Sequence, residues 1–342
     1  MSSFAEPAVR HWDFPRGIAG VALLLRFGAE HGVPAPDLLA GSGITPARLA
    51  DPTAEVDADQ ELRVVRNLAA HLPNAGVEVG TRYHATTFGV LGFAFLSAAT
   101  VQDAVDTALR YLDLSFAFTA PTAALEHDHL VIGLHPRSLP ADVSTFLVER
   151  DLAAIHTVIN ELAPGGAPTL SVAFTHQPPA DTRPHHDTFG VHPTFATHHN
   201  RLVVDATVLR RTLPLANPET TAACEQQCRT LATRRRDRQG VTSAVRDLLR
   251  HSERFTEPMS TVARSLGLST RTLRRRLAES GTTYQILLDQ ARAERATALL
   301  DQHRWSVEQI ATRLGFAEAA SFIHAFRRWH GTTPGDYARS RR

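Results

Sequence analysis

The chain has 342 residues, enough for two domains that each bury a hydrophobic core. Its net charge is only +1, but residues 1–218 hold 14 Arg against 22 Asp and Glu (−8), whereas residues 219–342 hold 22 Arg against 13 acids (+9). No stretch reaches the roughly 18 apolar residues of a helical membrane span, so no such span is predicted. An acidic body with a basic end is typical of a nucleic-acid-binding tail domain on a separate domain.

The first 16 residues are expected to form a flexible N-terminal tail. Residues 18–27, reading IAGVALLLRF, imitate the apolar part of a signal peptide. Arg26 and Glu30 interrupt the pattern, and no small-residue cleavage site follows. We therefore expect an amphipathic first helix from Gly17 and a cytoplasmic protein.

Residues 17–215 show helical and strand patterns in irregular order, which predicts an α+β domain because regular βαβ alternation is missing. Residues 88–97 (FGVLGFAFLS) fit a strand or a buried helix equally well. The expected helices are a first helix from Gly17, a short piece at 38–40 after the Pro34–Pro36 break, 57–72, 101–112 and 142–162. The expected strands are 114–119, 130–134, 170–174 and 202–204.

The expected helix 142–162 carries a long apolar side that packs either in the core of the domain or in a dimer seam. The sequence leaves both alternatives open. The apolar positions are Phe146, Leu147, Ile155, Val158, Ile159 and Leu162.

Two groups of side chains suggest further chemistry. Six histidines between His176 and His199 could bind a transition metal, but the prolines among them favour solvated loops, and no metal site is predicted. The histidines are His176, His185, His186, His192, His198 and His199. Cys224 and Cys228 share one face of an expected helix, and two reduced thiols are favoured over a redox switch.

Residues 216–240 are expected to link the first domain to a DNA-binding domain at 241–342. The linker contains an expected helix at 219–231 and the basic run Arg234–Arg236. That run fits a solvated linker or an extra phosphate contact, and the linker is slightly favoured.

Residues 259–281, MSTVARSLGLSTRTLRRRLAESG, predict a helix, a tight turn at Gly267–Ser269 and a second helix, as in a helix-turn-helix. Leu273 and Leu277 stand four residues apart and assign one face of the second helix to the core. At about 100° per residue, Arg275 points away from both leucines. A helix with outward Arg can enter the major groove and pair with guanine O6 and N7.

The second helix therefore predicts a first DNA-reading surface. Arg271 and Arg275 are expected to read bases with help from Thr272, while Arg274 and Arg276 contact phosphates. The candidate DNA-binding residues of this surface are Thr270, Arg271, Thr272, Arg274, Arg275 and Arg276.

A second copy of the motif follows, because Ala263–Leu268 (ARSLGL) recurs 48 residues later as Ala311–Phe316 (ATRLGF). Ser306 and Gln309 predict a capping box before its first helix. Its second helix, about 318–329, is expected to bury Phe322, Phe326 and Trp329. The candidate DNA-binding residues on its other face are Ala320, Ser321, Ile323, His324 and Arg327.

The helical stretch 284–300 contains no Gly or Pro and can act as a stiff spacer between the two copies. The two units of one chain are expected to enter successive major-groove segments about 10 base pairs apart. Because their recognition helices differ, the site read by one chain should not be internally palindromic. His324 and Ser321 are the expected polar readers, and Ala320 and Ile323 can touch thymine methyl groups.

The motifs of the last 100 or so residues resemble the AraC/XylS family of bacterial transcription regulators. The resemblance rests on A-x-x-L-G-L-S in the first unit, A-x-x-L-G-F with Phe322 and Phe326 in the second, and Gly331–Tyr337 (GTTPGDY). His324 stands where the family usually has Arg, and Ala319 and Ala320 stand where polar residues are common. Weaker or more apolar base reading is expected there.

Residues 20–215 are similar to the amino-terminal effector domain of one branch of that family, a domain named for arabinose binding. The resemblance implies a sensor domain but transfers no ligand. The matching positions are Gly32–Pro34, Leu38–Ala40, Asp51–Pro52, Gly89–Leu96, Ser97, Thr100, Arg110–Tyr111, Phe189–Gly190, Pro193 and Phe195.

We therefore expect an α+β effector and oligomerisation domain followed by an all-α, homeodomain-like domain with two helix-turn-helix units. The expected function is DNA-binding transcription regulation controlled by a small-molecule effector, and the resemblance implies activation. The expected partners are double-stranded DNA, RNA polymerase, the effector and a second copy of the chain, without a cofactor. The alternatives are a first domain that only oligomerises, or an enzyme, although G-x-S-x-G, GxxxxGK[ST], GxGxxG and HExxH are all missing.

Overall fold

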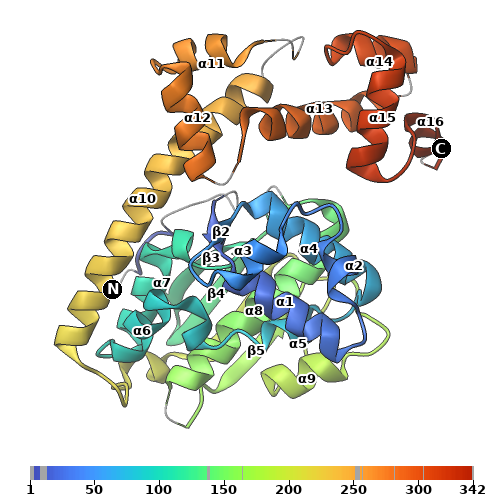
Figure 1. Cartoon of the computed structure of the whole chain (residues 1–342). Helices are drawn as coiled ribbons and strands as arrows, with labels where there is room; N and C mark the ends of the chain where they lie inside the picture. The colour runs from blue at the N-terminus through green and yellow to red at the C-terminus, as the bar shows by residue number, and fades with distance from the viewer. Residues whose placement is uncertain are drawn as a thin grey trace. The chain divides into compact units, whose positions relative to one another are not determined.

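The computed structural model describes residues 4–7, 14–136, 139–163, 165–250, 255, 257–280, 282–302 and 304–340. The chain divides into two compact units, residues 1–235 and 236–342 (Figure 1). None of the helices in the described part of the chain combines the length and hydropathy needed to cross a lipid bilayer.

The first unit is an α+β domain, as the mixed pattern predicts. Its helices are α1 (Ala19–Glu30), α2 (Ala35–Leu39), α3 (Pro46–Ala50), α4 (Ala58–His71), α5 (Gly76–Gly80), α6 (Val90–Ser97), α7 (Val101–Arg110), α8 (Ala141–Leu162) and α9 (Arg183–Phe189). Short 3-10 helices are η1 (Ala85–Phe88), η2 (Leu112–Leu114) and η3 (Ala206–Arg210).

Two antiparallel sheets accompany these helices. The small sheet pairs β1 (Arg16–Gly17) with β2 (Glu55–Val56). The larger sheet has the strand order β3-β4-β6-β5, and all its pairs are antiparallel. Its strands are β3 (Ala120–Glu126), β4 (His129–His135), β5 (Thr169–Ala173) and β6 (Asn200–Asp205).

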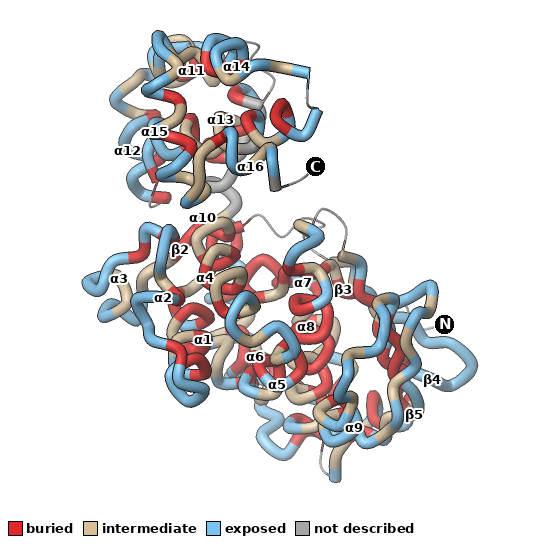
Figure 2. The backbone as a smooth tube through the Cα atoms, turned by 90° about the vertical axis from the view of Figure 1, so that its right-hand side faces the viewer, coloured by how far each residue is buried: buried red, intermediate tan, exposed pale blue. Residues whose placement is uncertain are grey.

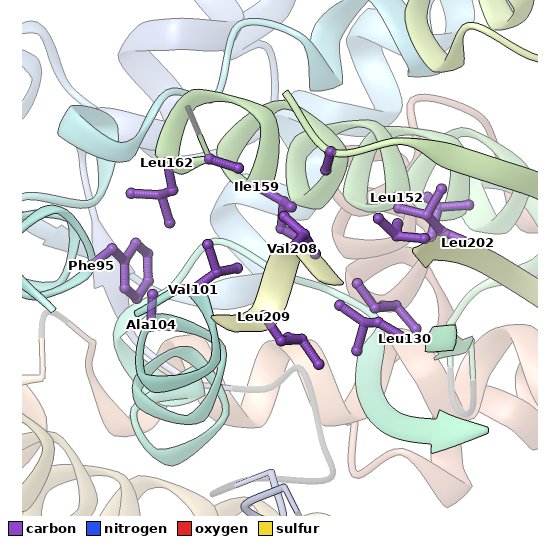
Figure 3. Close-up of a cluster of buried hydrophobic side chains, with 14 of the residues drawn as sticks. Phe95, Val101, Ala104, Leu130, Leu152, Ile159, Leu162, Leu202, Val208 and Leu209 are labelled. Carbon is purple, nitrogen blue, oxygen red and sulfur yellow. The ribbon is translucent and has the colours of Figure 1, made fainter. Parts of the chain in front are cut away.

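Helix α8 is the central element of the first unit, and most of its length is buried (Figure 2). Ile159 and Leu162 of α8 lie in one hydrophobic cluster with Phe95 of α6 and Ala104 of α7 (Figure 3). The apolar side of 142–162 thus packs within its own unit, as the core alternative requires. On another side, a Cβ added at Gly80 would lie 2.5 Å from the Cβ of Ala153, so only glycine allows α5 to approach α8 this closely.

The strand predicted at 114–119 is wrong, because β3 begins only at Ala120. The backbone of this segment bonds to buried side chains instead of a sheet ladder. The amides of Phe118 and Thr119 donate to Asp151 Oδ2 at 2.9 and 2.8 Å, and the carbonyl of Phe116 accepts from Arg150 Nη2 at 2.8 Å. The alternation of apolar residues therefore reflected burial without strand pairing.

The ambiguous segment 88–97 is mainly helical, since α6 covers Val90–Ser97. Gly92 explains the tight packing there: a Cβ at this position would come within 1.7 Å of the carbonyl oxygen of Ala85. In the apolar stretch 18–27, Ile18 is the N-cap residue of α1 and the remaining residues lie in the helix, where Leu24 and Phe27 are buried in the core.

Helix α10 (Pro218–Arg250) contributes residues to both units. Cys228 and Ala232 are buried in the core of the first unit, while Val245 and Leu249 are buried in the core of the second. Arg235 donates to Glu55 Oε1 and to the carbonyl of Asp113, both at 2.8 Å. This residue of the basic run is therefore neither solvated nor free for phosphate. The side chain of Arg236 lies outside the described residues.

The second unit is all α-helical around one hydrophobic core. Its remaining helices are α11 (Met259–Ser265), α12 (Thr270–Glu279), α13 (Tyr284–Leu300), α14 (Val307–Arg313), α15 (Ala319–His330) and α16 (Pro334–Ser340). The spacer predicted at 284–300 coincides with α13.

Candidate nucleic-acid interface

Helices α11 and α12 form the first helix-turn-helix. Gly267 in the connecting turn has φ +65°, a left-handed conformation that glycine adopts without strain. The Ser269 hydroxyl caps α12 by accepting from the amide of Thr272 at 3.1 Å. Leu273 and Leu277 are both fully buried, so the predicted core face of α12 is correct.

The opposite face of α12 exposes Arg271, Arg274, Arg275 and Arg276. Thr270 and Thr272 are half-buried at its N-terminal end, where the Thr272 hydroxyl lies 2.8 Å from that of Ser269. Arg275 Nη1 donates to Glu279 Oε1 at 2.8 Å, one helical turn onward. Glu279 therefore holds Arg275, which is expected to read bases, and the sequence pattern did not predict this pairing.

Helices α14 and α15 repeat the arrangement with different chemistry. The predicted capping box is present, because Ser306 and Gln309 each accept the other's backbone amide. Gly315 takes φ +76° in the turn, as Gly267 does. Phe322 and Phe326 are fully buried, and Trp329 is half-buried beside them. Ala320, Ser321, His324 and Arg327 are exposed on α15, and Ile323 is half-buried.

Arg292 on α13 contacts segments in or next to both helix-turn-helix copies of the second unit. Its Nε donates to the carbonyl of Leu314 and its Nη2 to the carbonyl of Phe255, both at 2.9 Å. Its guanidinium also lies 4.8 Å from the ring centre of Phe316. These contacts join the spacer to segments beside both α11 and α14. The sequence alone does not distinguish Arg292 from the neighbouring Arg295 of the spacer, so this role was not predicted.

The histidines and cysteines noted in the sequence lie in different surroundings. Within the described ranges, no three His, Cys, Asp or Glu side chains lie where they could share a metal ion. The picture of solvated loop histidines is wrong for His185, which is buried in α9 and lies 2.8 Å from Glu149 Oε1. Cys224 and Cys228 are free thiols, and burial raises the pKa of Cys228 to about 12, which disfavours its reactive thiolate.

Two protein-family models match the chain, one in each of its two units. Residues 32–213 match the model of the arabinose-binding domain of AraC transcription regulators, N-terminal part. Residues 262–340 match a helix-turn-helix domain model. The chain belongs to the AraC/XylS family of transcription regulators.

Several known regulators are similar to this chain over nearly its whole length. An HTH-type transcriptional regulator of Mycobacterium tuberculosis is 37% identical over 99% of both chains. The ornithine utilization regulator of Pseudomonas aeruginosa is 31% identical, covering 94% of this chain and 95% of its own. The solved structure of the transcriptional regulator CdpR from P. aeruginosa is 24% identical, with a TM-score of 0.46, covering 94% of this chain and 98% of that one.

Proposed function

We propose that this regulator reads a two-part DNA site through α12 and α15, and that a small molecule bound by the N-terminal domain controls the reading. The observation that carries the proposal is one shared core presenting two exposed helix faces, the first with four arginines and the second with a mixed face. The regulator is proposed to act in the cytoplasm as a homodimer and as an activator that contacts RNA polymerase.

The two faces are proposed to read DNA by different means. On α12, Arg271 and Arg275 read bases, and Arg274 and Arg276 bind phosphates, because guanidinium groups match guanine edges and phosphate oxygens. Thr270 and Thr272 lie at the N-terminal end of the helix, the end that meets base edges in helix-turn-helix complexes.

On α15, the side chains that are proposed to read DNA are shorter than the arginines of α12, and fewer of them are charged. His324 and Ser321 offer hydrogen bonds, Ala320 and Ile323 offer apolar contact to thymine methyl groups, and Arg327 offers a phosphate contact. The segment read by α15 is therefore proposed to tolerate more base changes than the segment read by α12.

Effector control is supported by a cavity in the N-terminal domain. The cavity has a volume of about 130 Å³ and lies between α6, α7, α8 and β3. Apolar clefts of this kind are common ligand sites. A ligand there would change DNA affinity only by binding one arrangement of the regulator better than another.

The test of DNA reading is selection of bound sequences from a random library with the full chain at two salt concentrations. A two-part site with centres about 10 base pairs apart is expected. Binding without a recovered motif, falling steeply as salt rises, would mean that the contacts are mainly with phosphates. Transcription in vitro from a promoter carrying the recovered site, with purified polymerase, then tests activation directly.

A further inference from the structure

The polar groups that face the cavity of the N-terminal domain identify the kind of molecule that fits it. All but five of the residues around the cavity have side chains without polar atoms. The five exceptions are Tyr83, Ser115, Thr122, Arg150 and Asp151. The hydrogen bonds of these five show which atoms remain to bind a ligand.

Three of the five already use their polar groups within the protein. The Ser115 hydroxyl donates to the carbonyl of Leu112 at 2.7 Å and accepts from the amide of Ala117 at 3.2 Å. Thr122 Oγ1 donates to the carbonyl of Gly133 at 3.4 Å. Both carboxylate oxygens of Asp151 are occupied, Oδ2 by two amides and a hydroxyl and Oδ1 by the neighbouring guanidinium.

Two donors remain, on two side chains that pack against each other. Tyr83 Oη and Arg150 Nη1 are buried and have no hydrogen-bond acceptor among the described residues. The guanidinium carbon of Arg150 lies 5.5 Å from the ring centre of Tyr83. Burial raises the pKa of the Tyr83 phenol, so the phenol keeps its proton and remains a donor. A buried donor without an acceptor costs about 1–3 kcal/mol, so a ligand that supplies acceptors here is favoured.

The local charge favours an anionic acceptor. Arg16 and Arg150 are both fully buried beside Glu61 and Asp151. Burial raises the pKa of Glu61 in spite of the attraction of Arg16 and Arg150, which promotes its protonated form. Arg16 pairs with Glu61 at 3.5 Å and Arg150 pairs with Asp151, but Arg150 keeps one donor, Nη1, without a partner among the described residues. A carboxylate is the acceptor that best matches a guanidinium donor.

We propose that this cavity holds a small, mainly apolar carboxylic acid whose carboxylate binds Arg150 Nη1 and Tyr83 Oη. A volume near 130 Å³ is close to the engineered cavity of about 150 Å³ that binds benzene, so the apolar body is about the size of one ring or a six-carbon chain. A pentose does not fit this chemistry, because most of its hydroxyl groups would be buried without partners.

This assignment rests on the proposed effector control and can be tested separately from it. Hexanoate, 1-hexanol, hexylamine and arabinose are titrated into the full chain by calorimetry. Hexanoate is expected to bind at least tenfold more tightly than 1-hexanol, while hexylamine and arabinose show no binding. Equal binding of the acid and the alcohol, or binding of none of the four, would overturn the proposal.

Two matched variants each remove one hydroxyl from the cavity wall. Tyr83→Phe deletes a donor that has no protein partner, and Thr122→Val deletes a hydroxyl that already has one. Tyr83→Phe is expected to weaken hexanoate binding about tenfold without changing 1-hexanol binding. Thr122→Val is expected to leave hexanoate binding unchanged. Equal effects of the two variants would refute the carboxylate position.

A cavity-filling variant, Ala108→Leu, is expected to abolish binding of both the acid and the alcohol while the chain stays folded. Hexanoate binding that survives in this variant would place the ligand elsewhere and overturn the assignment. Binding of operator DNA is measured in parallel with and without hexanoate. If hexanoate binds as expected but DNA affinity does not change, the proposed effector control of DNA binding is refuted, while the ligand site remains established.

Discussion

Replacing Arg275 by Ala tests base reading by α12. Bidentate pairing of an arginine with guanine is worth about 1–3 kcal/mol. Arg275 must first release Glu279, an exposed pair worth about 0.3–0.5 kcal/mol, so the expected loss at the preferred site is about 0.5–2.7 kcal/mol. Competition binding of the full chain to the selected site and to its single-base variants measures this loss. The preference at one base pair should relax.

The single variant Arg275→Ala should also lose DNA affinity for a reason unrelated to base reading. Arg275→Ala leaves Glu279 unpaired on the helix that is proposed to face DNA, where its charge would repel the phosphates of every sequence. The double variant Arg275→Ala/Glu279→Ala removes that repulsion, so the loss that persists in it is the base-specific part. Arg274→Ala is the matched control: as a phosphate contact it should weaken all sites alike and reduce the salt slope by about one. An equal loss on all sequences in the double variant would refute base reading by Arg275.

Two further predictions concern the stability of the N-terminal domain. Burial lowers the pKa of His156 to about 4. The unfolded chain therefore takes up this proton near pH 6.5 and the folded chain only near pH 4, so the free energy of unfolding should fall by about 2 kcal/mol from pH 7.5 to 5. Urea unfolding of wild type and His156→Gln measures that difference. Asp151→Ala leaves the buried Arg150 uncompensated and should cost about 3–5 kcal/mol, whereas Asp142→Ala, at an exposed pair with Arg66, should cost less than about 1 kcal/mol.

Each stability prediction has an outcome that would contradict it. An equal pH slope in wild type and His156→Gln would mean that His156 does not contribute to acid destabilisation. Similar losses in Asp151→Ala and Asp142→Ala would mean that burial does not decide the strength of these two ion pairs.

The all-α unit was predictable because its periodic residues act locally. Leu273 and Leu277, like Phe322 and Phe326, recur at helical spacing, and each pair lies on the buried face of its helix. The capping box at Ser306 is equally local, since both its partners lie within one turn. In such segments, the residues that determine the local structure are close to one another in the sequence as well as in space.

The N-terminal domain was less predictable because its deciding contacts are distant in sequence. Arg16 bonds to the carbonyl of Phe116, 100 residues away, and Asp151 takes the amides of Phe118 and Thr119. These contacts replace a strand that the apolar alternation favoured. The one available signal was the charged triplet Glu149–Asp151 inside an apolar helix, where all three side chains are buried. Charged residues at that position of an apolar helix indicate a cluster of buried, paired charges and not a solvent-exposed face of the helix.

The length of helix α13 limits which insertions and deletions this regulator can tolerate. Its 17 residues span about 25 Å at 1.5 Å each, and one inserted or deleted residue would turn everything beyond it by about 100°. Such a change would turn α15 away from the major-groove segment proposed for it and would separate Arg292 from one of the two carbonyl groups that it contacts. The exposed side chains of α12 and α15 can be exchanged without disturbing the core, but the length of α13 between the two helices must stay constant. The proposed operators can therefore change in base sequence without changing the spacing of their two parts.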